Sequence, residues 1–129
     1  MNPVLLTKSQ DNIKASELLI NNKFYATSIH CSYYSVYQRL VYTLNCLKTS
    51  MNLNISDTHK RSIDAITQEL KKQNRAKAED IEDFTNRITA LKSLRKRADY
   101  EIKMIIESES RDAFKESKEL NKFLFDNIE

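Results

Sequence analysis

The sequence predicts an all-α protein, an up-and-down bundle of four or five helices. Glycine is absent and there is one proline among 129 residues. Tight hairpins rely on glycine, so an extensive antiparallel sheet is disfavoured. Apolar residues recur at three- and four-residue spacing along most of the chain, which is typical of helices packed on a common core. A helical chain without glycine is expected to end its helices on Asn or other polar residues.

Composition narrows the class of protein further. A chain of 129 residues fits a single domain, 1–129. Glycine-rich phosphate loops, Rossmann turns and nucleophile elbows all require glycine and are excluded. The net charge of +3 permits a nucleic-acid partner without requiring one. No segment approaches the roughly 20 apolar residues of a membrane span. Two cysteines too far apart on one helix to bridge favour a reducing, cytoplasmic setting.

The first two helices are expected at residues 5–20 and from residue 24 to 47 or 48. Asn21 and Asn22 provide the stop between them. The expected buried side chains of the first helix are Ile13, Ala15, Leu18 and Leu19. The second helix carries two apolar stripes, which predict a central helix with neighbours on more than one side.

The rest of the chain is expected to form three more helices. Polar residues predict a loop at 49–56, and a third helix follows at 58–73. The segment at 71–80 is expected to be a solvated link, with continuation of the helix as the alternative. The fourth helix starts near Asp80 and the fifth at Ser108 or Ser110. The stripe of the fourth helix comprises Ile81, Phe84, Ile88, Leu91, Ala98, Ile102 and Ile105; that of the fifth comprises Ala113, Leu120, Phe123 and Ile128.

Arg95 interrupts the apolar stripe of the fourth helix. A buried guanidinium is costly unless a charge or a ligand meets it. Asp99 follows at the i,i+4 spacing of a helical ion pair. An internal Arg95–Asp99 pair is one interpretation. The other is that Arg95 faces a cleft or a dimer seam and binds phosphate, which suits its planar fork of donors.

Tyrosines and histidines supply the other candidate site residues. Five of the six tyrosines lie between Tyr25 and Tyr42. Tyr34 could offer a hydroxyl or a stacking surface beside Arg95. The alternative is that the tyrosines form a buried aromatic layer. His30 is a candidate acid–base group. Neither histidine has a metal-ligand companion at useful spacing, so no metal site and no cofactor are predicted.

Two segments together resemble the HEPN family of helical proteins. The run ASELLINNKFYATSIHCSYYSVYQRLVYTL is similar to the first half of its signature, and LRKRADYE is similar to the second. The matching residues are Ala15, Leu18, Leu19, Tyr25, Ala26, Tyr33, Tyr34, Arg95, Ala98, Asp99 and Tyr100. The resemblance covers most of the chain. It implies a four- or five-helix bundle that forms a homodimer, within a prokaryotic toxin–antitoxin or antiviral defence module.

The resemblance also implies contact with RNA or nucleotides, and often a small nucleotidyltransferase partner that modifies a tyrosine near Tyr100 in some members. Many members are metal-independent RNases whose dimers join two Arg–His motifs, with four to six residues between Arg and His. Here those positions hold Tyr100, Glu101 and Ile102 instead. The chain is therefore similar to the branch that lacks the catalytic histidine.

Three functions follow as hypotheses. The first is a non-catalytic HEPN-like homodimer that pairs through its long central helices and binds RNA, a nucleotide or a nucleotidyltransferase partner. Its cleft would be lined by Arg95, Arg97, Asp99, Tyr100, His30 and Tyr34. The second is an RNase toxin that uses Arg95 with His30 or Tyr100. The third is a structural adaptor, in which Asp99 fully occupies Arg95.

Overall fold

The computed structural model describes residues 3–47 and 58–128, which form five helices without strands. The predicted loop at 49–56 lies outside the described residues. The helices are α1 Pro3–Asn21, α2 Tyr25–Cys46, α3 Thr58–Lys72, α4 Ala78–Tyr100 and α5 Glu107–Ile128. Among the described residues, none of these helices has both the length and the apolarity that a membrane span requires.

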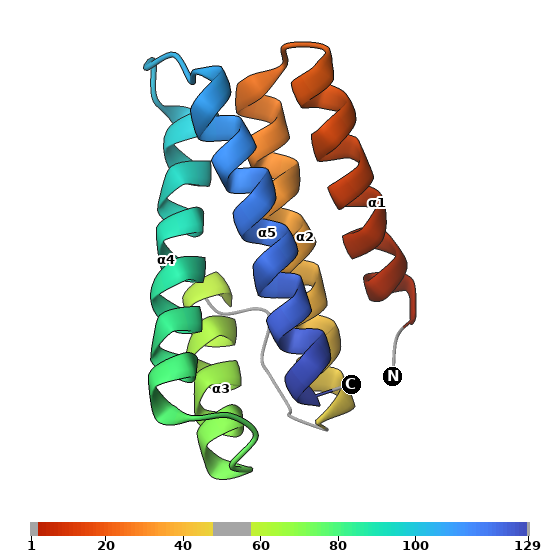
Figure 1. Cartoon of the computed structure of the whole chain (residues 1–129), viewed down its shortest axis with the longest axis vertical. Coiled ribbons are helices and arrows are strands. Elements are labelled where there is room, and N and C mark those ends of the chain that lie inside the picture. The colour runs from red at the N-terminus through yellow and green to blue at the C-terminus, as the bar shows by residue number, and fades with distance from the viewer. Residues whose placement is uncertain (1–2, 48–57, 129) are drawn as a thin grey trace.

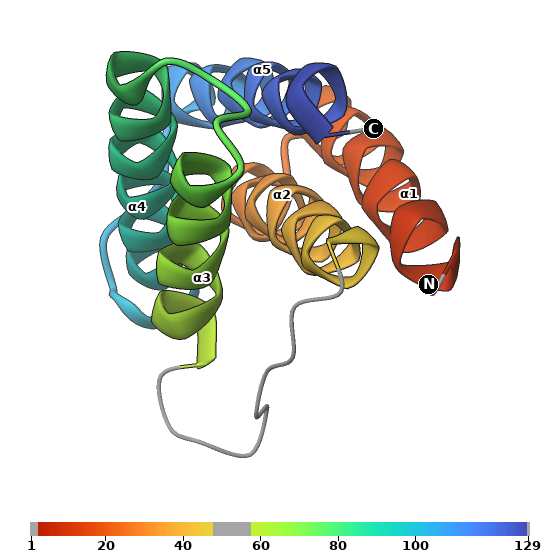
Figure 2. The ribbon, with the colours of Figure 1, turned by 90° about the horizontal axis from the view of Figure 1, so that it is seen from below.

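The other helices surround α2. It packs against all four of them, and α1, α5, α4 and α3 follow one another around it (Figure 2). Along the long axis, α1, α2, α4 and α5 alternate in direction, as an up-and-down bundle requires (Figure 1). The short α3 departs from this expectation, since it runs in the same sense as α2 (Figure 1). The predicted all-α bundle and the central position of α2 are confirmed.

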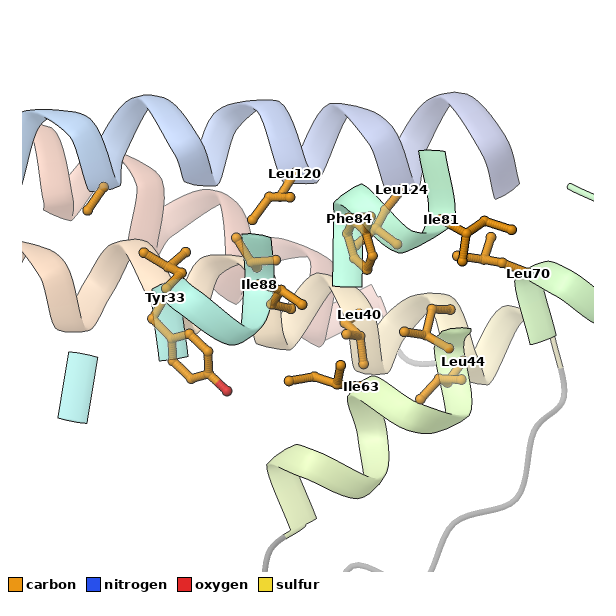
Figure 3. Packing of buried hydrophobic residues seen from close by; sticks show 14 of the residues in the cluster. Tyr33, Leu40, Leu44, Ile63, Leu70, Ile81, Phe84, Ile88, Leu120 and Leu124 are labelled. Carbon is orange, nitrogen blue, oxygen red and sulfur yellow. The ribbon is translucent and has the colours of Figure 1, made fainter. Parts of the chain in front are cut away.

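The core is mainly aliphatic, with Tyr33 and Phe84 among its members, and draws on α2, α3, α4 and α5. Figure 3 shows that Leu40, Leu44 and Ile88 interdigitate with Phe84 between the helices, and that Tyr33 lies at one end of this group. Fully burying such a side chain contributes about 1.5–3 kcal/mol to stability, so these contacts fix the relative position of α2 and α4.

A row of buried serines joins α1 to α2. Ser16 Oγ lies 2.6 Å from Ser32 Oγ, and Ser9 Oγ donates to the Ser35 carbonyl at 2.6 Å. Small side chains let the two helix backbones approach closely, and each hydroxyl finds a partner in the seam. The apolar face predicted for this helix is wrong in part, because Leu18 is exposed while serines occupy the buried face.

Two helix ends adopt the left-handed conformation without glycine. Lys23 has φ 67° and Asn74 has φ 54°. At the first, the Phe24 N–H donates to the Leu19 carbonyl and the Lys23 N–H to that of Ile20, which is a Schellman cap. Polar residues therefore occupy the left-handed positions at the ends of α1 and α3 that glycine usually takes, as the composition predicted.

Helix α4 ends earlier than its apolar stripe predicted. It stops at Tyr100, and Glu101 is extended, with ψ 153°. Ile102 is therefore fully exposed, whereas Ile105 reaches the core from the following segment. The link at 71–80 was also expected to lack an apolar anchor, yet Ala76 packs against the core. The early end of α4 matters because it leaves Tyr100 at the rim of the region around Arg95.

Candidate functional site

Arg95 lies in the last turns of α4, with its side chain buried against α2. The residue is only 6% exposed. Its position continues the buried face of α4 formed by Ile88 and Leu91. The guanidinium carbon lies 5.2 Å from the ring centroid of Tyr33 and 5.4 Å from that of Tyr34. Aromatic faces attract a cation by about 0.5–2 kcal/mol, so these rings partly offset the loss of hydration.

Asp99 connects Arg95 to a histidine on α2. Its Oδ2 accepts a hydrogen bond from His30 Nδ1 at 2.8 Å and lies 3.5 Å from Arg95 Nη1. The predicted Arg95–Asp99 pair is present, but the shorter contact belongs to the histidine. In a neutral ring, donation from Nδ1 leaves the lone pair on Nε2. The His30 side chain is 45% exposed, so this imidazole is the accessible part of the arrangement.

Most of the hydrogen-bonding capacity of the guanidinium is unused. An arginine has five N–H donors. Within the described residues, Arg95 makes the long contact to Asp99, and its buried Nε has no partner. A buried donor without an acceptor costs about 1–3 kcal/mol, and more when it is charged. The site therefore holds a cation that is neutralised in part by a carboxylate shared with His30.

A second histidine closes the aromatic cluster. His59, in the first turn of α3, lies 2.7 Å from the Tyr33 hydroxyl through Nδ1. Its ring stacks on Tyr37, with centroids 4.0 Å apart and planes 2° from parallel. These contacts join α3 to α2 and hold the Tyr33 ring against Arg95. Sequence reasoning missed this role, because the two residues are 26 positions apart and no short motif connects them.

Two pKa shifts describe the electrostatics around the cluster. Burial raises the pKa of the Tyr33 hydroxyl well above its ordinary value, although Arg95 acts in the opposite direction. Burial also raises the pKa of the Cys31 thiol, and the nearby Asp99 carboxylate adds to this effect. A thiol with a raised pKa is a poor nucleophile, so Cys31 is not a candidate for covalent chemistry.

The remaining predicted site residues lie farther from the guanidinium. Tyr100 is 76% exposed, and its ring centroid is 6.0 Å from the Arg95 Cζ atom. Arg97 turns instead toward α5, where its Nη2 donates to Glu109 at 3.3 Å. The structure therefore brings Arg95, Asp99, His30 and Tyr34 together and places Tyr100 at their edge. It does not bring Arg97 to the same point.

We call His30, Tyr34, Arg95, Asp99 and Tyr100 the arginine site. The functional groups of this site are an oriented imidazole, a buried guanidinium and an exposed phenol. The guanidinium matches the geometry of phosphate, and the phenol ring can stack on a base. No group of three or more His, Cys, Asp or Glu side chains suited to a metal ion occurs within residues 3–47 and 58–128.

No protein-family model matches the chain, and no curated protein matches it at a significant level.

Proposed function

We propose that this protein is a HEPN-like helical bundle that binds RNA at the arginine site as a homodimer, without cleaving it. The buried arginine supports this proposal most strongly. An aliphatic residue at this position would satisfy the core, yet the position holds a cation whose buried Nε has no partner among the described residues. A phosphate oxygen is an acceptor that can meet such a donor with a charge-assisted hydrogen bond.

Tyr100 gives the ligand a way to reach Arg95. Its exposed ring lies 6.0 Å from the Arg95 Cζ atom, and the ring can move without disturbing the core. Base–aromatic stacking contributes about 1–3 kcal/mol per base in proteins that bind single strands. A phosphate near Arg95 and a base on Tyr100 together suit an unpaired RNA segment. A purely structural adaptor is less well supported, because Asp99 does not fully occupy Arg95.

The setting we propose is a toxin–antitoxin or defence module with a small nucleotidyltransferase as a second component. This part rests on the sequence resemblance. The exposure of Tyr100 is compatible with modification by such a partner, since its hydroxyl is not confined by the core.

A homodimer would use the surface beside the arginine site. Helix α2 offers little free area, because Thr27 and Asn45 are its exposed residues. The segment that follows α4 instead exposes Ile102, Met104 and Ile106. Contiguous exposed apolar side chains commonly mark protein–protein contacts. Pairing there would place two arginine sites near a common seam.

RNA binding is predicted to depend on Tyr100. In a fluorescence-anisotropy titration with labelled single-stranded RNA and EDTA, Tyr100→Ala should weaken binding about tenfold, which corresponds to roughly 1.4 kcal/mol of lost stacking. Leu18→Ala is the control, as Leu18 is also an exposed apolar residue but lies on α1, which does not pack against α4. Equal losses in the two variants, or no binding by the wild type, would contradict the proposal.

Dimer formation is predicted to depend on the segment after α4. Sedimentation across the micromolar range should show a dimer for the wild type and a monomer for Ile102→Asp combined with Met104→Asp, because buried carboxylates oppose an apolar contact. Val4→Asp, at the far end of α1, should remain dimeric. A wild-type chain that stays monomeric throughout this range would refute the dimer.

A second candidate function is metal-independent RNA cleavage, and the His30–Asp99 contact favours it. Asp99 orients His30 as carboxylates orient catalytic histidines, which leaves Nε2 able to accept a proton. His30 would remove the proton of a ribose 2′-hydroxyl. The oxygen would then attack the adjacent phosphorus and expel the 5′-oxygen, which takes its proton from the Tyr100 hydroxyl at the edge of the site. The products are a 2′,3′-cyclic phosphate and a 5′-hydroxyl.

Incubation of total RNA with the protein in EDTA separates the two functions. Cleavage by this route should fall about a hundredfold or more in His30→Ala, the usual contribution of a general base. Asn45→Ala changes an exposed polar residue near the other end of α2, and it should retain activity. Intact RNA with the wild type rules out cleavage and leaves the binding proposal standing. Cleavage that survives in Arg95→Ala would place the activity elsewhere.

A further inference from the structure

A groove of about 490 Å³ lies between α1, α2 and α5. It is on the opposite side of α2 from α3 and α4, and therefore away from the arginine site (Figure 2). Pockets for small ligands typically have volumes of roughly 300–1,000 Å³. We call it the basic groove. Its lining residues are Ser9, Gln10, Ile13, Lys14, Arg39, Lys118, Asn121, Lys122 and Phe125.

The described charged residues that line the basic groove are all positive. Lys14 enters from α1, Arg39 from α2, and Lys118 and Lys122 from α5, and this part of the lining has no carboxylate. Asp126 pairs with Lys122 at 2.5 Å, just beyond the groove, so the excess charge rests on Lys14 and Lys118. The protein carries a net charge of only +3, so this local excess of cations stands out from the rest of the chain. Such a groove favours a ligand with several negative charges.

An aromatic ring lies beside these cations. Phe125 is 54% exposed, although the Arg39 guanidinium lies 5.7 Å from its ring centroid. Lys118, Asn121, Lys122 and Phe125 share one face of α5, since they follow the i, i+3, i+4, i+7 pattern. An exposed ring next to a guanidinium can stack with a flat heterocycle. A phosphate group alone would not stack on this ring.

A buried acceptor in the lining remains without a donor. Asn121 is 8% exposed, and its Nδ2 donates to Ser35 Oγ at 2.9 Å. This hydrogen bond orients the amide, yet its Oδ1 has no partner within the described residues. Buried polar atoms in folded proteins are nearly always paired, so an orphaned acceptor calls for a donor from outside the chain. The amino group of a base is such a donor.

We infer that the basic groove binds a mononucleotide. Its phosphate would lie among the lysines of α1 and α5, its base would stack beside Phe125, and a base N–H would meet Asn121 Oδ1. An inorganic anion would use the lysines alone, and an apolar ligand would leave them unpaired. A nucleotide alone uses all three features. The inference goes beyond the proposed function, because the groove is separate from the arginine site and does not depend on RNA binding there.

The test is a titration of ¹⁵N-labelled protein with AMP in EDTA, followed by amide chemical shifts. AMP should shift amides of α1 and α5 around Lys14 and Asn121. Adenosine lacks the phosphate and inorganic phosphate lacks the ring, so each should bind at least about tenfold more weakly than AMP. Lys118→Glu and Phe125→Ala, both at exposed positions, should weaken AMP binding to a similar degree.

Two controls separate this inference from the proposed function. Lys96→Glu makes the same charge change on α4 and should leave AMP affinity unchanged; Tyr100→Ala should also leave it unchanged while it weakens RNA binding. The inference is overturned if AMP shifts amides around His30 and Tyr100 instead, or shifts none. It is also overturned if inorganic phosphate binds as tightly as AMP, or if Lys118→Glu and Lys96→Glu lose affinity equally.

Discussion

The burial of one guanidinium constrains the whole arrangement of α2, α3 and α4. Arg95 occupies a place where a helical bundle normally has an aliphatic side chain, and its desolvation has to be offset locally. Tyr33 and Tyr34 supply aromatic faces, and Asp99 supplies a carboxylate. Those tyrosines are in turn held by His59 from α3. A short helix outside the up-and-down order of the other four is therefore tied to the site through the aromatic cluster.

The other side of α2 is built on a different principle. Without glycine, the chain brings α1 close through serines, each of which satisfies its hydroxyl within the seam. Hydroxyl pairs contribute little net free energy, about 0.5–1.5 kcal/mol each, but they tolerate no larger side chain. This seam fixes α1 beside α2 and α5, and the basic groove lies where the three helices meet. The two candidate sites thus depend on separate contacts of the same central helix.

Periodicity predicted much of this structure and missed what depends on tertiary contact. The five helices, the inward position of Arg95 and its pairing with Asp99 follow from spacing along single helices. The contact between His30 and Asp99 joins residues 69 positions apart, so no local pattern could indicate it. Serines on the buried face of α1 were missed because a pattern search counts apolar residues. The end of α4 at Tyr100 was missed because the sequence there has neither glycine nor proline.

The affinity of folded Arg95→Met for single-stranded RNA tests the central claim most directly. Loss of one member of a buried ion pair lowers stability, but Asp99 keeps its hydrogen bond from His30 and methionine has a similar length, so we expect the variant to remain folded. If Arg95 is retained to meet phosphate, RNA affinity should fall at least about tenfold, because a hydrogen bond to a charged group contributes roughly 1.5–3 kcal/mol. A folded Arg95→Met protein that binds RNA as tightly as the wild type would show that the guanidinium serves the fold alone.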